Sequence, residues 1–405
     1  MTSKKKPELL APAGDWTMLN TAIQSGADAI YFGVKNLNMR AKANNFDISD
    51  LTEIVSVCKK NNVDSHLTLN SIVFESELDE LDQIIKSAKN AGVDMIICWD
   101  PSVIIKCKEY NIPFCISTQA SISNSHAVRY YENLGAKRVV LARECTLEKI
   151  IEIRKKSSIE IEAFVHGAMC IAVSGRCFMS HEIFGKSANR GGCIQPCRRE
   201  YEIVDKDDNY SMVIGEDYVL SPKDLCTIEF IDKLIESGID AFKIEGRKRS
   251  PEYIAKTVST YRDSIDKYFS GLLTLQEKQK YVEDLKKVYN RGFSPGFYFD
   301  TPGGESYAGT YGSIATTRKV YVGKILNYYK KSKVAYLKIE ADKISPGDSI
   351  YIIGSTTGTI ELKVSEIFYN DNAVTEANKG ENVTIFCDER VREFDKVYKI
   401  VNVDS

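Results

Sequence analysis

From Glu8 to about Gly246, short apolar runs alternate with longer segments whose apolar side chains recur at helical spacing. Runs of this kind indicate buried strands, and the segments between them indicate helices that cover a sheet. Eight strands are predicted, at Leu9–Ala11, Ala29–Phe32, Asp64–Leu69, Met95–Cys98, Phe114–Ser117, Arg138–Leu141, Ile159–Val165 and Ala241–Ile244. The predicted helices include Leu51–Asn61, Leu78–Ala91, His126–Leu134, Thr146–Lys155 and Thr227–Ser237. Eight strands with intervening helices predict a parallel (β/α)8 TIM-like barrel.

A doubly wound open sheet would show the same alternation. It would not usually need eight repeats, and the sequence APAGD after the first strand is not the glycine-rich fingerprint of a dinucleotide site. The barrel is therefore favoured, and functional groups are expected at the carboxyl ends of its strands.

Two further regions follow different patterns. About 75 residues separate the end of the seventh strand near His166 from the eighth strand at Ala241, and so long a connection is usually functional. Beyond residue 317 the apolar period changes to two, with strands predicted at Val320–Val322, Val334–Ile339, Ser349–Ile353, Thr359–Val364, Val383–Phe386 and Val397–Val401. We therefore predict a barrel domain over 1–290 with an insertion at about 167–240, a linker over 291–317 and a small C-terminal β-barrel over 318–405.

Composition narrows the class of protein. The 405 residues carry 54 Lys+Arg against 56 Asp+Glu, a formal charge of −2, which is ordinary for a folded protein and leaves room only for local basic patches. The N-terminal residues are too short and polar a segment for a signal peptide, and no apolar run is long enough to cross a bilayer. The sequence predicts a cytoplasmic protein without a membrane partner.

The cysteines are concentrated in the insertion. Five of eleven lie within residues 170–226: Cys170, Cys177, Cys193, Cys197 and Cys226. Four thiolates from one insertion would suit an iron–sulfur cluster or a structural zinc ion. Only Cys193 and Cys197 resemble a zinc knuckle, so the irregular spacing favours a cluster, although buried apolar cysteines are the simpler alternative.

Other polar residues follow the predicted strand ends. His166 stands four residues before Cys170 and could be a functional group or a hydrogen-bonded core histidine. Lys243 and Glu245 share one face of the eighth strand, and Arg247 after it could bind a phosphate or carboxylate, unless this segment is a solvated charge run. Arg143 follows the sixth strand and adds to this polar rim, and Arg190, Arg198 and Arg199 beside the cysteines add positive charge that suits an anionic substrate.

Several motifs together resemble one family. They are EAFVHGAMC at 162–170, NRGGCIQPCR at 189–198, SPKDLC at 221–226 and KIEGRKRS at 243–250. The chain resembles the collagenase-like peptidase family U32 over nearly its whole length. The resemblance implies either a collagenase-type peptidase or an RNA- or quinone-hydroxylating protein with a four-cysteine [4Fe-4S] cluster.

Length, single barrel and C-terminal β-module resemble the tRNA-hydroxylating branch of that family. This branch implies oxygen-independent conversion of wobble uridine to 5-hydroxyuridine, with prephenate as the hydroxyl donor and tRNA as the partner. The family motifs imply Cys170, Cys177, Cys193 and Cys226 as cluster ligands, with Cys197 as a possible substitute.

Within this hypothesis, Lys243, Arg247 and Arg143 bind the donor's carboxylates and His166 or Glu245 moves a proton, while Arg190 contributes to anion binding. The alternatives left open are a peptidase with a cysteine nucleophile and His166, a hydroxylase of ribosomal RNA or quinone, and a cluster-bearing subunit that acts with a protein partner or paralogue.

Overall fold

The computed structural model describes residues 5–40, 44–202, 206–207, 220–310 and 312–403. The two outermost domain bounds, at 1 and 405, and Tyr311 in the predicted linker lie outside these ranges.

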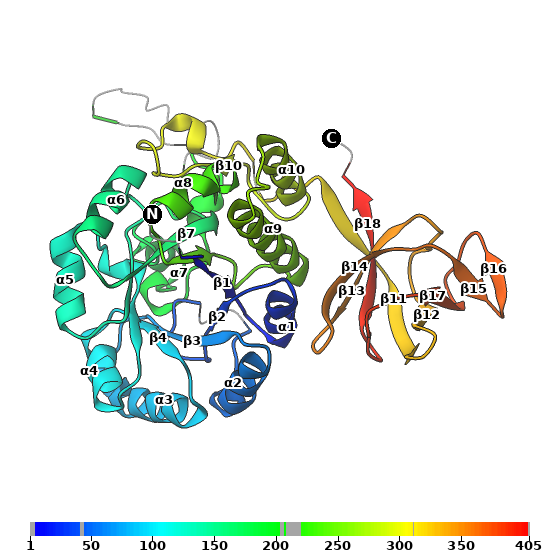
Figure 1. Ribbon diagram of the computed structural model, residues 1–405, viewed down its shortest axis with the longest axis horizontal. Coiled ribbons are helices and arrows are strands. Elements are labelled where there is room, and N and C mark those ends of the chain that lie inside the picture. Colours follow the sequence, from blue (N-terminus) through cyan, green and yellow to red (C-terminus); the bar gives the residue numbers. More distant parts are fainter. Residues whose placement is uncertain (1–4, 41–43, 203–205, 208–219, 311, 404–405) are drawn as a thin grey trace.

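Eight parallel strands close into a barrel, as the sequence predicts (Figure 1). They are β1 (Glu8–Pro12), β2 (Ala29–Phe32), β3 (Asp64–Leu69), β4 (Met95–Cys98), β5 (Phe114–Ile116), β6 (Arg138–Val140), β7 (Glu160–Gly167) and β9 (Ala241–Ile244). Neighbours in sequence are neighbours in the wall, and β9 pairs with both β1 and β7, which closes the ring. The predicted (β/α)8 barrel is confirmed.

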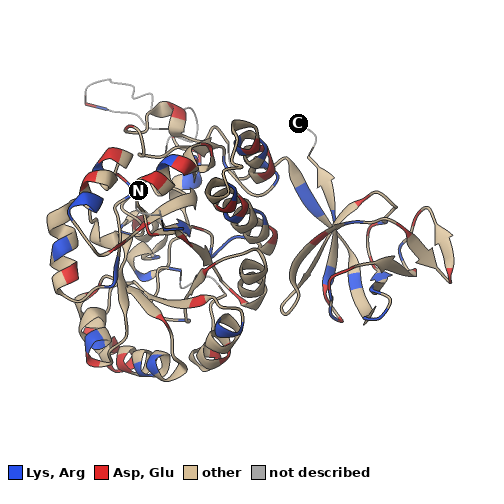
Figure 2. Ribbon diagram, in the orientation of Figure 1, with Lys and Arg blue, Asp and Glu red and all other residues tan. Residues whose placement is uncertain are grey.

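Helices surround this ring and bury one face each against it. They are α1 (Trp16–Gln24), α2 (Leu51–Lys60), α3 (Leu78–Ala91), α4 (Pro101–Glu109), α5 (Ser125–Asn133), α6 (Leu147–Lys155), α8 (Ile231–Glu236), α9 (Pro251–Phe269) and α10 (Leu275–Lys286). Local sequence sets their starts: the Asp15 carboxylate accepts the backbone N–H of Met18, and the Thr146 hydroxyl accepts that of Lys149. Lys and Arg are interspersed with Asp and Glu on the outer helix surfaces (Figure 2).

The insertion after β7 contains α7 (Met179–Phe184) and a short strand β8 (Asp224–Cys226). β8 pairs antiparallel with the end of β7, with Leu225 opposite Gly167 and Cys226 opposite His166, and β10 (Phe293–Ser294) adds to β8 in parallel. Two segments that the sequence assigns to a loop and a linker therefore extend the barrel wall. Short 3-10 turns complete the described domain: η1 (Ile48–Asp50), η2 (Glu75–Glu77), η3 (Thr118–Ala120), η4 (Ala188–Arg190), η5 (Pro196–Arg198), η6 (Ile228–Phe230) and η7 (Gly304–Ser306).

The C-terminal module is a separate antiparallel sheet over one apolar core, which confirms the predicted β-module. Its strands are β11 (Thr317–Tyr329), β12 (Val334–Ile339), β13 (Ser349–Gly354), β14 (Gly358–Lys363), β15 (Ile367–Tyr369), β16 (Asn372–Val374), β17 (Asn382–Phe386) and β18 (Lys396–Asn402). The order across the sheet is β14-β13-β18-β11-β12-β17-β15-β16.

The module rests on the barrel through the β13–β14 hairpin and α1. The Gln24 side-chain amide donates to the carbonyl of Thr357 at 2.9 Å, and the hydroxyls of Thr21 and Thr359 lie 3.0 Å apart. An ion pair between Lys256 on α9 and Glu361 on β14 joins the two at the surface.

No helix in the described part of the chain is both long and apolar enough to span a bilayer.

Candidate functional site

A cavity opens at the carboxyl ends of the barrel strands. Its floor and walls come from residues at or just after these ends, and its rim comes from the insertion after β7. This is where a barrel of this type places its functional groups.

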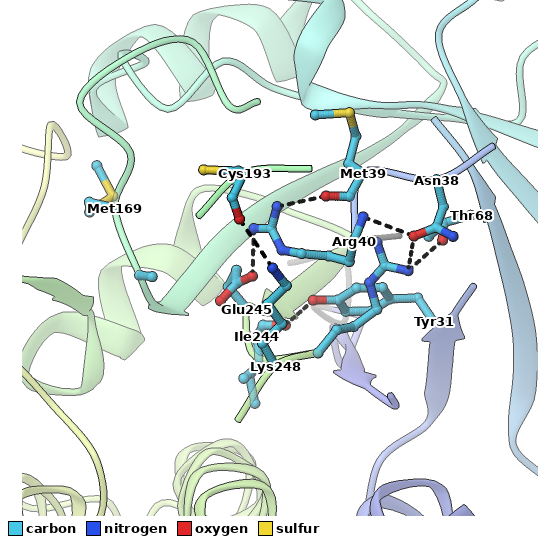
Figure 3. Close-up of polar contacts among 12 residues, drawn as sticks. Tyr31, Asn38, Met39, Arg40, Thr68, Met169, Cys193, Ile244, Glu245 and Lys248 are labelled. Atoms are coloured by element: carbon cyan, nitrogen blue, oxygen red, sulfur yellow. Dashed lines mark hydrogen bonds and ion pairs between the residues drawn. The ribbon is translucent and has the colours of Figure 1, made fainter. Parts of the chain in front are cut away.

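Two arginines and a glutamate form one side of the cavity (Figure 3). A guanidinium nitrogen of Arg40 lies 2.9 Å from a carboxylate oxygen of Glu245. Arg247 donates to the Thr68 hydroxyl at 2.9 Å and to the Asn38 side-chain oxygen at 3.2 Å. These contacts fix both guanidinium groups in position before any ligand binds.

Glu245 remains ionised in this setting. Burial would raise its pKa, but the guanidinium groups of Arg40, Arg249 and Arg143 outweigh it and lower the pKa to about 2. A carboxylate with so low a pKa is a weak base at neutral pH. The geometry therefore favours an electrostatic role for Glu245, that of a fixed negative charge among arginines, over the proton transfer expected from the sequence.

Arg143 also lines the cavity, and it is only partly hydrogen-bonded. Its guanidinium lies 4.1 Å from the centre of the Phe164 ring, and it donates to the Ala168 carbonyl at 3.0 Å. Its Nε is buried and has no hydrogen-bond partner among the described residues, and burial lowers the pKa of the guanidinium. Because a buried N–H without an acceptor costs free energy, this group is suited to receive an anionic ligand.

Lys243 lies on the cavity floor with its charge already paired. Its ammonium nitrogen is 2.7 Å from a carboxylate oxygen of Glu162 and 4.6 Å from the centre of the Tyr31 ring. Glu162 is completely buried, and although burial opposes it, Lys243 and Arg138 keep its pKa below the ordinary value. Lys243 can thus orient a ligand while its ammonium group donates a hydrogen bond to Glu162.

Four cysteines line the cavity on the insertion side: Cys170, Cys177, Cys193 and Cys197. None of the four is fully buried, and all are free of disulfide bonds. Burial and, to a smaller extent, the three other thiols raise the pKa of Cys197 to about 11, although Arg198 opposes them. Four sulfur donors therefore converge on one cavity.

Arg198 fixes the insertion to the barrel beside these cysteines. It is buried, and it donates to the Ser221 hydroxyl at 3.1 Å and to the carbonyls of Pro222 and Met169. Burial lowers the pKa of this guanidinium to about 10. The hydrogen bonds of Arg198 thus hold the insertion in place at the rim of the cavity.

Cys226 and His166 lie outside the cavity lining, and an irregularity in the pairing of β7 explains the position of both. In the pairing of β7 with β9, Phe164 lies opposite Lys243 but His166 lies opposite Ile244, so β7 contains a bulge. The bulge reverses the alternation of inward and outward side chains along β7, so His166 points to the outer face of the barrel. Cys226 lies opposite His166 on β8, so its side chain points to the same face.

On that outer face both side chains pack against α9. His166 Nδ1 is 3.5 Å from the Tyr261 hydroxyl, which itself lies 4.0 Å from the Cys226 sulfur. Burial, together with Arg249, lowers the pKa of His166 to about 3, so the ring is neutral, and burial raises the pKa of Cys226 to about 12. Of the two readings of His166 drawn from the sequence, this environment is that of a core histidine.

Arg190 is also outside the lining. It pairs with Glu77 at 2.9 Å and lies 4.5 Å from the centre of the Phe74 ring, so it ties the insertion to the segment before α3. Of the other residues expected at the site, the structure brings Lys243, Glu245, Arg143 and Arg247 into one cavity with four of the five clustered cysteines.

Tyr31, Thr68 and Asn70 also line the cavity, and the sequence analysis missed them. Tyr31 donates its hydroxyl to the Ile244 carbonyl at 2.8 Å, and Thr68 holds Arg247. Each stands at or just beyond the end of a correctly predicted strand. A search of every strand end for polar side chains, whatever the neighbouring sequence, would have found them.

Comparison with known proteins shows the family. A model of peptidase family U32 matches residues 14–308. A collagenase of Porphyromonas gingivalis is 40% identical over 97% of this chain and 97% of its own length. The tRNA hydroxylation protein P1 of Bacillus subtilis is 39% identical over 88% of this chain and 86% of its own length. The 23S rRNA 5-hydroxycytidine synthase of Escherichia coli is 33% identical over 72% of this chain and 45% of its own length.

The family model thus spans the barrel from α1 onward, the insertion and every cysteine and arginine that lines the cavity. The chain belongs to peptidase family U32.

Proposed function

We propose that this protein is an iron–sulfur-dependent RNA-modifying enzyme that hydroxylates the wobble uridine of tRNA to 5-hydroxyuridine, with prephenate as hydroxyl donor. The observation that carries the proposal is the cavity that joins four thiols to four arginines at the barrel mouth. Relatives named for tRNA hydroxylation and for 5-hydroxycytidine synthesis in rRNA support an RNA substrate.

The donor set fits an iron–sulfur cluster. Cys170, Cys177, Cys193 and Cys197 would hold it, because these four thiols line the same cavity and none is used in a disulfide. Cys226 is the ligand expected from the family motif, but in this structure its sulfur lies behind the barrel wall beside Tyr261. When bound, a [4Fe-4S] cluster would supply one-electron transfer next to the substrates.

The chain's own residues would bind and orient the donor. Prephenate carries two carboxylates, and Arg143 and Arg247 present guanidinium groups suited to pair with them. Glu245 holds Arg40 in place, and Lys243 contributes positive charge to the floor. Overall, the C5–H bond of uridine and a C–O bond of the donor break while C5–OH forms and the hydrogen replaces the donor's hydroxyl, so no further oxidant is needed.

The test is genetic and chemical. The gene is deleted, the strain is complemented with wild type or Cys170→Ala, and hydroxylated uridine in total tRNA is measured by nucleoside mass spectrometry. We expect the nucleoside to disappear on deletion and to return only with wild type. An unchanged level in the deletion strain would contradict the tRNA assignment, and ribosomal RNA and quinones would be measured next.

A separate experiment identifies the fourth cysteine ligand of the proposed cluster. Iron and sulfide per chain, and the visible absorption of anaerobically purified protein, are compared for Cys197→Ser and Cys226→Ser. We expect loss of cluster in the first and retention in the second. The reverse result would assign Cys226, in agreement with the family motif, and would require β8 to shift when the cluster binds.

The collagenase-like alternative lacks a catalytic pair in this geometry. Among the described residues, no histidine lines the cavity that holds the exposed thiols, and His166 faces α9. A cysteine peptidase needs a base within reach of its nucleophile.

A further inference from the structure

The C-terminal module exposes an unusual set of aromatic rings on one face of its sheet. Four adjacent strands, β11, β12, β17 and β15, carry Tyr329, Tyr336, Phe386 and Phe368. We call these four residues the aromatic face.

Strand register places the four rings on the same side. Val334 lies opposite both Tyr329 and Phe386, which makes one row across three strands. Tyr336 lies opposite Thr384, and Thr384 lies opposite Phe368, which makes the next row of the same face two residues along. Directly opposed residues project to the same side of a sheet, so the rings form a compact two-row group.

The opposite side of these strands is the core of the module. Ala335, Leu337, Val383 and Ile385 alternate with the residues of the aromatic face and are buried. The rings themselves are open to solvent: Tyr329 is 47% exposed, Phe386 54% and Phe368 37%. They are therefore not needed to fill the core, and an exposed aromatic group of this kind marks a binding surface.

The polar residues between the rings suit a nucleic acid. The remaining outward positions of the two rows and their continuation are Val334, between Tyr329 and Phe386, and the polar residues Asn327, Thr384, Asn382, Lys324 and Lys338. None of these is acidic; Glu340, just beyond β12, pairs with Lys324 at 3.1 Å. Lys338 is exposed, and Lys330 and Lys331 are exposed in the turn between β11 and β12.

We propose that the aromatic face binds a single-stranded stretch of RNA, with bases stacked on the rings and phosphates near Lys338 and the turn lysines. Thr384, between Tyr336 and Phe368, and Asn327, beside Tyr336, can hydrogen-bond to bases that stack on the rings, and the lysines supply positive charge for the phosphates. The choice of RNA rests on the proposed function. The site itself lies in a different domain from the cavity.

The test uses the full-length protein and fluorescence anisotropy with a labelled twelve-nucleotide oligouridylate and with an unmodified tRNA transcript. The double variant Phe368→Ala/Phe386→Ala removes two rings, and Lys338→Glu reverses a charge. The matched controls are Phe394→Ala, which removes a ring that is 67% exposed in the loop before β18, and Lys363→Glu, at the end of β14 on the barrel side of the module. All of these side chains are exposed or half-exposed, and the melting temperature is measured to confirm folding.

We expect the double variant to weaken binding of both RNAs by about tenfold or more, Lys338→Glu by a few-fold, and the controls by less than twofold. Equal affinity of wild type and the double variant would overturn the proposal. A change of oligomeric state in the double variant without loss of RNA affinity would also overturn it and assign the face to a second copy of the chain.

Failure of the two proposals can be told apart. If wild type binds RNA through this face but the deletion strain keeps its hydroxylated uridine, only the proposed reaction is wrong. If the deletion strain loses the nucleoside and the double variant binds RNA like wild type, only the proposed surface is wrong.

Discussion

The two ends of the barrel hold contrasting groups of buried charge. At the amino ends of the strands, one arginine, Arg138, meets three carboxylates: Glu8 at 2.7 Å, Glu160 at 2.8 Å and Glu162 at 3.3 Å. At the carboxyl ends the ratio is reversed, because the guanidinium groups of Arg40, Arg143 and Arg249 act on the single carboxylate of Glu245.

The difference lies in how completely each group is satisfied. Each of these three carboxylates pairs with Arg138, and Glu162 pairs with Lys243 as well. At the carboxyl end an N–H of Arg143 has no acceptor, and the group faces a large cavity. Buried charges of the same kinds thus serve structure where they are paired and ligand binding where they are in excess.

The largest expected effect is at the paired end. Glu162→Ala removes a fully buried carboxylate and leaves both Lys243 and Arg138 without it, so the free energy of unfolding should fall by about 3–5 kcal/mol. Urea denaturation measures this. Glu160→Ala, on the same strand and the same arginine but partly exposed, is the control and should cost clearly less. Equal losses would mean that burial does not distinguish the two pairs.

The next effect is a pH dependence at the cavity. The pKa of Glu245 is lowered from 4.5 to about 2, so its carboxylate stabilises the fold fully above pH 4.5 and loses this contribution as the pH falls toward 2. Wild type should exceed Glu245→Gln by up to about 3 kcal/mol at pH 7. Unfolding curves from pH 7 to pH 2 should show the difference shrinking only below about 4.5. A difference in the free energy of unfolding that stays constant with pH would show that the charge of Glu245 does not stabilise the fold.

A smaller change in stability, but a clear change in binding, is expected for Arg143→Met. Because the substitution breaks the bond to the Ala168 carbonyl and the contact with the Phe164 ring, the free energy of unfolding should fall by about 1–2 kcal/mol. On the proposed function, prephenate affinity should fall about tenfold or more. Equilibrium dialysis measures the affinity. Arg190→Met is the matched control, since Arg190 pairs with Glu77 outside the cavity, and its prephenate affinity should stay at the wild-type value.

The smallest effect is expected for an exposed pair between the domains. Glu361→Gln breaks the contact with Lys256 at the surface and should change the free energy of unfolding by at most about 1 kcal/mol, and less in high salt. Thermal unfolding at two salt concentrations checks this. A loss of unfolding free energy as large as that of Glu162→Ala would contradict the expectation that buried ion pairs stabilise the protein more than exposed ones.

Most of the barrel could be predicted because its strands are short, largely apolar runs that alternate with helical segments, as is typical of parallel strands under helices. β8 and β10 could not, since strands of three and two residues have no visible period and form only because β7 offers them an edge. The other observed strands begin or end within a residue or two of the predicted bounds. For example, β5 covers Phe114–Ile116, whereas the sequence predicts Phe114–Ser117.

At the site, the rule that function gathers at strand ends correctly selected Lys243, Glu245, Arg143 and Arg247 as cavity residues. The same rule selected His166, but an extra residue in β7 turned that side chain outward, and a bulge of this kind depends on the pairing of β7 with β9. Arg190 was chosen for its nearness to cysteines along the chain, whereas its partner Glu77 is 113 residues away. Both differences come from contacts between distant segments.

The pairing that closes the barrel also sets a delay during synthesis. Glu8 lies opposite Ala241, which is made 233 residues later. At roughly 5–20 residues per second, β1 therefore waits roughly 10 to 50 s on the ribosome before its last neighbour exists. For that time an apolar strand has one bare edge, the situation in which a nascent chain pairs with a wrong partner. A mutation that slows elongation before residue 241 would thus be expected to lower the yield of folded protein without changing the finished structure.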